Sequence, residues 1–197
     1  MNNTLDPFLH RPDPEGFHPL GKGRPAPPRM KVKHIYIMRD QLLYDIDTES
    51  LMVARARRQE NIDPNNIPAD EDGFRPMFKR WVDTYLSKAL SRMKAYVKEP
   101  PRIAKTNSLK EWTEKDIVLE MPDNWNENSF DPLATAVHDY IVNGVLFEYF
   151  SLNLTGKDPV TVSKHEAMTT AYDEIKNNLI SPIPGTAQKP LHHFGIL

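Results

Sequence analysis

The sequence contains no cysteine among its 197 residues. This absence excludes disulfide bonds, thiolate-bound zinc or iron–sulfur sites, and a cysteine nucleophile. Long hydrophobic runs are also missing: no stretch approaches the ~18 apolar residues of a membrane-spanning helix, and the first seven residues lack the basic and apolar regions of a signal peptide. We therefore expect a soluble protein that is not exported and does not bind a membrane.

Neither sign of charge dominates, and glycine is scarce. The 25 Lys and Arg residues nearly balance the 27 Asp and Glu residues, giving a net charge of −2, so no overall field attracts nucleic acid or an anionic membrane. The eight glycines form no phosphate-binding loop. Gly21 and Gly23 lie in a proline-rich segment without a preceding strand or a following helix, and Gly144 and Gly156 stand alone. These patterns exclude the common nucleotide-binding loops.

Proline is abundant instead, and it is concentrated toward the ends of the chain. Seven of the 18 prolines fall in residues 1–33 and three in residues 181–197, where they prevent a regular ladder of backbone hydrogen bonds. We therefore expect an extended N-terminal arm (1–33), a helical core domain (34–180) and an extended C-terminal arm (181–197). Six Lys and Arg residues against three Asp and Glu residues give the N-terminal arm a net charge of +3.

Apolar residues recur at helical spacing in four segments of the core. The first, residues 35–60, has a stripe made of Ile35, Met38, Leu42, Ile46 and Val53. The second, residues 76–98, has a wider apolar stripe opposite a basic face. The third begins at Asp131-Pro132, an N-cap followed by a first-turn proline, and is apolar on several faces, so we expect it at the centre of the core. It ends at Gly156, and the fourth helix begins in the same way at Asp158-Pro159.

One short segment has the character of a strand. Residues 117–119 (Ile-Val-Leu) form a short apolar run, and residues 102–105 are the candidate partner in a small hairpin. The expected fold class is therefore mainly α: a compact bundle of about four helices, with a small β-hairpin and extended N- and C-terminal arms.

The residues that suggest catalysis or metal binding do not have the spacing that the known motifs require. His165-Glu166 would need a second histidine at position 169 to match the zinc-protease motif, and residue 169 is Thr. His192 and His193 are adjacent on the expected arm, where neighbouring side chains point to opposite sides. The acidic runs 45–47 and 70–72 lack the spaced oxygens and turn glycine of a calcium loop.

His138-Asp139 suggests a base oriented by a carboxylate. Neighbouring residues on a helix do not face one another, so we expect no such pairing. No nucleophile, base and orienting group occur at a usable spacing elsewhere. The prediction is a protein that is not an enzyme and has no catalytic residue, no metal and no cofactor.

The basic face of residues 76–98 is interleaved with Trp81, Tyr85 and Tyr96, a combination that also occurs on nucleic-acid-binding surfaces. Their spacing assigns these aromatic residues to the buried stripe, which favours a solvated basic face. A nucleic-acid-binding adaptor or regulator that uses this helix and the basic N-terminal arm is the alternative function.

The C-terminal half resembles a known family. A Trp-Asn loop at Trp125 precedes a helix that reads Leu133-x-x-x-Val137-His138-Asp139-Tyr140-Ile141-Val142-x-x-x-Leu146-x-x-Tyr149-Phe150, and an Asp158-Pro159 break leads to a helix with Tyr172 and Ile175. The segment Leu42-Leu43-Tyr44-Asp45-Ile46-Asp47 and Ala54-Arg55-Ala56-Arg57 is similar to the first helix of the same proteins. They are the small helical head–tail connector (neck or adaptor) proteins of tailed phages and prophages of the Bacteroides group. The matching segments cover about half the chain.

The resemblance implies a structural virion protein that forms a ring, usually twelvefold, between the portal protein and the tail or neck proteins, with DNA passing through it. It places the protein in the host cytoplasm during assembly and in the virion neck afterwards. In that family helices form the body of the ring, and termini or loops clasp neighbouring subunits.

Apolar side chains within proline-rich arms gain little from exposure to water, so we expect partner subunits to cover them. The predicted apolar anchors are Phe8, Phe17, Leu191, Phe194, Ile196 and Leu197. The predicted contacts to acidic partner surface are Arg24, Arg29, Lys31 and Lys33. Each arm could instead pack on its own core. Deleting residues 1–30 separates the two arrangements: the core should stay folded and assembly should weaken if the arm binds a partner, whereas the core should fail to fold if the arm is part of it.

Overall fold

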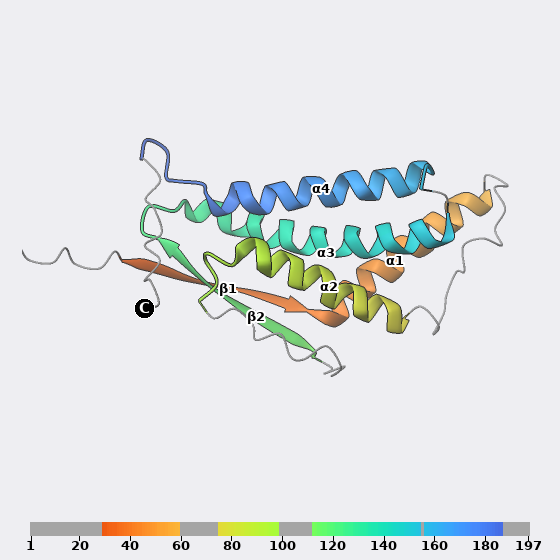
Figure 1. The fold of residues 1–197 in the computed structure, drawn as a ribbon, viewed down its shortest axis with the longest axis horizontal. Coiled ribbons are helices and arrows are strands. Elements are labelled where there is room, and N and C mark those ends of the chain that lie inside the picture. Colours follow the sequence, from red (N-terminus) through yellow and green to blue (C-terminus); the bar gives the residue numbers. More distant parts are fainter. Residues whose placement is uncertain (1–28, 60–74, 99–111, 155, 187–197) are drawn as a thin grey trace, which may run out of the picture.

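The computed structural model describes residues 29–59, 75–98, 112–154 and 156–186. Its elements are strand β1 (Met30–Met38), helix α1 (Arg39–Gln59), helix α2 (Arg75–Met93), strand β2 (Glu114–Pro122), a short 3-10 helix η2 (Glu127–Ser129), helix α3 (Phe130–Asn153) and helix α4 (Pro159–Leu179). Figure 1 shows four helices beside a two-stranded sheet. The expected mainly α bundle with a small antiparallel sheet is confirmed.

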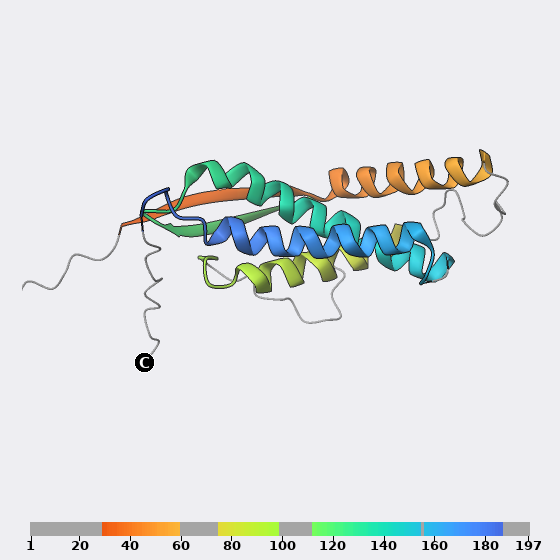
Figure 2. The ribbon, with the colours of Figure 1, turned by 90° about the horizontal axis from the view of Figure 1, so that it is seen from above.

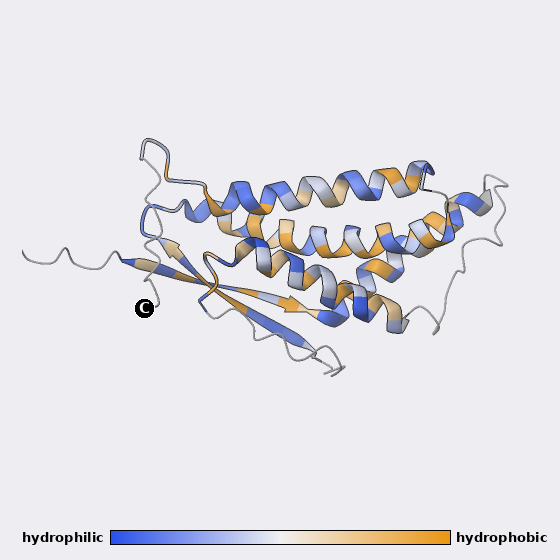
Figure 3. Cartoon of the chain, in the orientation of Figure 1, coloured by the Kyte–Doolittle hydropathy of each residue, from blue (hydrophilic) through white to orange (hydrophobic). Residues whose placement is uncertain are grey.

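Helix α3 lies at the centre of the core, as its sequence predicts. It packs against α1, α2 and α4, and eleven of its residues are buried. Figure 3 shows hydrophobic residues on several sides of α3, whereas α4 is hydrophilic over most of its length. Burial on one stripe is sufficient for α4, where Ala171, Ile175 and Leu179 face the core. A helix surrounded by neighbours must be apolar all round, which explains the difference between the two sequences.

The expectation of a helix beginning at Ile35 is wrong, because residues 30–38 form β1 and helix α1 begins at Arg39. Met30–Lys33, which fall within the expected N-terminal arm, belong to the same strand. Burial alternates along the strand, with Ile35 and Ile37 buried and their neighbours His34, Tyr36 and Met38 exposed. This two-residue period is that of a strand, whereas Ile35 and Met38 alone also fit a helical spacing.

Strand β2 contains the predicted strand residues 117–119, but its partner is β1. The two strands are antiparallel, with Ile35 opposite Ile117 and Lys33 opposite Leu119. The candidate partner, residues 102–105, lies outside the described residues. Since β1 precedes β2 by about 80 residues in the sequence, no local turn signal marks the pairing.

The helix starts agree with the sequence at α4 and differ at α3. Asp158 caps α4, its side chain accepting a hydrogen bond from the Val160 N–H at 3.0 Å. The expectation that Asp131 caps α3 is wrong: the helix begins at Phe130, and its N-cap Ser129 makes no side-chain cap bond. The 3-10 helix η2 runs directly into α3 and supplies the preceding turn. Asp131 therefore lies in the first turn of α3, where its charge complements the helix dipole.

The segment that follows α4 is tied back to the start of α3. The Ile183 N–H donates to the Asn124 carbonyl at 2.9 Å, and the Asn126 N–H donates to the Ser181 carbonyl at 3.0 Å. Trp125 is almost fully buried, and its indole N–H donates to the Asn178 carbonyl at 2.8 Å. The first residues of the expected C-terminal arm are thus attached to the core.

Candidate assembly surface

Strand β1 is the free edge of the sheet within the described residues. Its one neighbour there is β2. The other edge of β2 is already occupied by the segment after α2, because the Lys98 N–H donates to the Val118 carbonyl at 2.9 Å and the Glu120 N–H donates to the Tyr96 carbonyl at 2.7 Å. Figure 2 shows β1 on the side of β2 that faces away from α2. Another strand could therefore be added beside β1.

The phase of the hydrogen bonds identifies which β1 residues face the free edge. On β2, the backbone groups of Val118 and Glu120 point away from β1, so those of Leu119, between them, point toward β1. Leu119 is opposite Lys33, and the odd-numbered residues of β1 therefore bond to β2. The backbone groups aimed at the free edge belong to the even-numbered residues Met30, Val32, His34, Tyr36 and Met38.

The side chains of these same five residues form one face of the strand, which we call the outer β1 face. Its apolar members are exposed: Met30 by 39%, Val32 by 48%, Tyr36 by 58% and Met38 by 48%. His34 lies at the centre, its ring stacked on Tyr36 with 6.1 Å between centroids. Natural edge strands are commonly protected by charged side chains, proline or a bulge. The five even positions of β1 carry none of these, and the lysines of the strand, Lys31 and Lys33, are at odd positions.

Sequence reasoning did not identify the outer β1 face. The alternation in His34-Ile35-Tyr36-Ile37, together with the β-branched and aromatic residues of this segment, is the signal that could have found the strand. The helical spacing of Ile35, Met38 and Leu42 concealed that signal, because it continues without a break into α1.

The predicted cationic contacts Lys31 and Lys33 lie on the inner face of β1. The Lys31 ammonium is 2.9 Å from a carboxylate oxygen of Glu127 and that of Lys33 is 3.5 Å from the other oxygen. The hydrogen bond from Lys31, followed by the charges of both lysines, lowers the pKa of the Glu127 carboxyl. Lys33 also lies over the Phe130 ring, 5.7 Å from its centroid. Both lysines therefore attach η2 and the start of α3 to the strand.

The other predicted partner-binding residues are placed less fully. Arg29 is exposed immediately before β1. The remaining ones lie outside the described residues: Phe8, Phe17, Arg24, Leu191, Phe194, Ile196 and Leu197. Of the ten predicted contacts, the structure thus places three, and these three lie at or next to β1.

The expectation that His138 and Asp139 cannot pair is wrong. The His138 Nδ1 atom lies 3.2 Å from Asp139 Oδ1, and its Nε2 atom lies 3.0 Å from Asp45 Oδ2 on α1. The helical spacing of the two backbone positions does not predict this contact between adjacent side chains. Both ring nitrogens are engaged by carboxylates, so the group links α1 to α3 and leaves neither nitrogen to bind a substrate.

Two cations of the basic face of α2 contact other side chains of the chain. The Arg92 guanidinium lies 4.2 Å from the centroid of the Tyr172 ring and 3.5 Å from Asp173. The Lys88 ammonium lies 4.3 Å from the centroid of the Tyr85 ring. Tyr85 itself is buried, as the apolar stripe predicts, and Trp81 and Tyr96 are half-buried. These contacts involve Lys88 and Arg92, whereas Arg80 and Lys94 are exposed.

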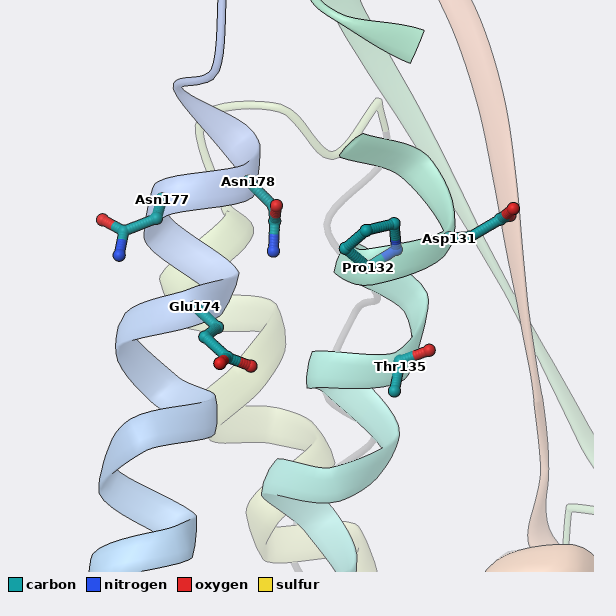
Figure 4. A pocket seen from close by; sticks show the side chains of 6 residues that line it. All are labelled: Asp131, Pro132, Thr135, Glu174, Asn177 and Asn178. Carbon is teal, nitrogen blue, oxygen red and sulfur yellow. The ribbon is translucent and has the colours of Figure 1, made fainter. Parts of the chain in front are cut away.

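One shallow hollow lies between the N-terminal end of α3 and the last turns of α4. It is lined by Asp131, Pro132, Thr135, Glu174, Asn177 and Asn178. Figure 4 shows Asp131 pointing away from α4, while Glu174 and Asn178 lie on the α4 side. The two carboxylates therefore do not converge on one point, and the hollow has neither the enclosure nor the convergent polar groups of a substrate site.

Within the described residues, no helix is long and apolar enough to cross a membrane. The same part of the chain contains no group of three or more His, Cys, Asp or Glu side chains placed to hold a metal ion. Comparison with protein-family models, with curated protein sequences and with solved structures gives no match to this chain.

Proposed function

We propose that the protein is a non-enzymatic structural subunit that acts by assembling with copies of itself and with partner proteins. The observation that carries this proposal is the free edge of β1 with its exposed apolar outer face. A row of backbone donors and acceptors beside four exposed apolar side chains is suited to pairing with another strand. The helical core holds this strand in place through Ile35 and Ile37, which are buried.

The connection between the strand and the expected N-terminal arm supports the same function. In the sequence, residues 1–28 lead through Arg29 directly into β1. In the proposed assembly, a partner that covers the outer β1 face would therefore meet the chain where the expected arm joins the strand. This arrangement suits a subunit clasped by its neighbours.

Within this general function we propose the role implied by the resemblance to phage head–tail connectors. The protein would then be a subunit of a twelvefold neck ring that joins the portal protein to the tail in the virion. The helical bundle would form the body of the ring, while β1 and the two arms would make contacts between subunits.

The test is a matched pair of variants studied by sedimentation velocity, each alone and mixed with a portal protein. Tyr36→Lys places a charge on the outer β1 face, whereas Tyr44→Lys makes the same change at a tyrosine on α1 that is exposed by 65%. The proposal predicts that Tyr36→Lys weakens association at least tenfold while Tyr44→Lys leaves it unchanged. Equal behaviour of both variants, or a full-length chain that associates with neither itself nor the portal protein, would contradict it.

Retention on DNA would distinguish the alternative class of function. A nucleic-acid-binding adaptor would show affinity that falls steeply with salt concentration, because cationic side chains displace counterions from the phosphates. The proposed assembly protein should instead associate through apolar and backbone contacts that salt affects little.

A further inference from the structure

We infer that the occupant of the free β1 edge is β1 of a second copy, paired antiparallel about a two-fold axis at His34. This inference rests on the proposed function, since it names the contact by which two subunits associate. Three features of the strand lead to it: the order of its side chains, the phase of its free backbone groups and the distribution of its charges.

The outer β1 face is symmetric about its centre. In an antiparallel pairing about His34, Met30 of one copy lies opposite Met38 of the other, and Val32 lies opposite Tyr36. Each exposed apolar side chain therefore meets an apolar partner, and His34 meets its own copy. An aromatic residue opposite a β-branched residue is a favourable cross-strand pair, and the two-fold axis generates it twice.

The backbone supports the same register. The free donors and acceptors of β1 belong to its even-numbered residues, as the bonds of Val118 and Glu120 show. The register about His34 sets even-numbered residues of the two copies opposite one another, so each such pair exchanges two N–H···O bonds. An axis at Lys33 or Ile35 also pairs even-numbered residues, but it leaves one terminal methionine without a partner and sets Val32 or Tyr36 against His34.

The charged side chains near this pairing have ion-pair partners within their own chain. On the inner face, Lys31 would lie opposite Ile37 of the second copy, and Lys33 would lie opposite Ile35. Both lysines keep their ion pairs with Glu127 of their own chain. The His34 ring lies 3.0 Å from the Asp116 carboxylate of its own chain, so each copy brings a carboxylate to the axis beside its imidazole.

The product is a continuous four-stranded sheet in the order β2–β1–β1–β2, with the helices of both copies on the same side. A two-fold contact of this kind closes on itself and builds a pair of subunits. A ring of subunits then needs a second, different contact between pairs. The predicted arm residues Phe8, Phe17, Leu191, Phe194, Ile196 and Leu197 are available for that contact in the sequence.

The absence of cysteine makes the register directly measurable with single labels. We would attach a nitroxide to the full-length Met30→Cys and Met38→Cys variants and record electron–electron dipolar couplings, with labelled Tyr44→Cys as the control for labelling and folding. In the inferred pair, positions 30 and 38 of different copies are opposite one another. Two labels at position 30 are eight residues apart along the sheet, about 27 Å at ~3.4 Å per residue.

The expected result is a long distance between the two nitroxides for each labelled variant alone. When the two variants are mixed, the nitroxide spectrum should show strong broadening from short-range coupling. A short distance within the Met30→Cys sample would indicate a parallel pairing and would overturn the inference, as would a mixture no different from its components. Oligomers in sedimentation without these couplings would overturn the register while leaving the proposed function in place. A chain that is monomeric alone and with the portal protein would overturn both.

Discussion

Replacing Gly144 by alanine tests the packing of α3 against α2. The Cβ atom of alanine at this position would lie 2.4 Å from two ring carbons of Tyr85 and 2.7 Å from a third. Carbon atoms in contact prefer a separation of at least ~3.5 Å, so the ring or the helix must move by about 1 Å. Nothing about the backbone of Gly144 itself requires glycine, because its φ is negative and helical.

The Tyr85 ring has little freedom to move. It is 3% exposed, its hydroxyl donates to a Glu148 carboxylate oxygen at 3.0 Å, and it packs edge-on against Tyr140 with 5.5 Å between centroids. Burial, reinforced by the Glu148 charge, raises the pKa of Tyr85 above its ordinary value.

These constraints set the size of the stability loss expected for Gly144→Ala. Overpacking a well-filled core costs about 1–3 kcal/mol, and the fixed ring places Gly144→Ala at the upper end, near 3 kcal/mol. The gain in helix propensity from glycine to alanine is about 1 kcal/mol. The net prediction is a loss of about 2 kcal/mol in the free energy of unfolding, or roughly 4–8 °C in Tm for a chain of this size.

The assay is urea denaturation followed by circular dichroism, with Gly156→Ala as the matched control. A Cβ atom on Gly156 would meet nothing within 4 Å, so that variant should stay within about 0.5 kcal/mol of the natural chain. A Gly144→Ala protein stabilised by about 1 kcal/mol, as at an exposed helical glycine, would refute the reasoning.

Two further predictions concern the ends of α4. Asp158→Ala should cost about 2 kcal/mol by urea denaturation, because Asp158 caps the helix at the Val160 N–H and pairs with Arg57. Burial alone would raise the pKa of Asp158, but the hydrogen bonds and charge of Arg57 and the bonds from the helix N–H groups lower it from 3.8. The natural chain should therefore keep this stability above pH 3.8 and lose it as the pH falls through the lowered pKa. The Asp158→Asn variant should lack this acid-dependent component. Trp125→Phe should cost about 1–3 kcal/mol of stability, because it leaves the Asn178 carbonyl without its indole donor. Faster hydrogen exchange at the Ile183 amide would report that the C-terminal segment is loosened. Unchanged exchange would show that Trp125 does not hold this segment.

Local signals were sufficient for much of the helical core. The Asp158-Pro159 start and the apolar surface of α3 depend on residues close in sequence, and the structure agrees with both. The start of α3 was missed because η2 supplies the turn that Asp131 was expected to cap. No feature of Asp131-Pro132 by itself encodes the presence of a preceding 3-10 turn.

The sheet and the assembly surface depended on distant residues. Whether Ile35 begins a helix or faces a strand is decided by Ile117, its partner across the sheet, and that contact is invisible in a window of the sequence. The pairing of His138 with Asp45 is equally non-local, since one side chain comes from α3 and the other from α1. Such contacts are set by how whole elements pack, which residue spacing does not specify.

The most direct test of the account is the mass of the full-length chain by sedimentation equilibrium over a wide range of concentration. Assembly through β1 predicts a mass that rises from 22.7 kDa to at least twice that value, and a Tyr36→Lys chain that requires at least tenfold higher concentration to do so. A mass that stays at 22.7 kDa throughout, or a rise that Tyr36→Lys does not alter, would contradict it.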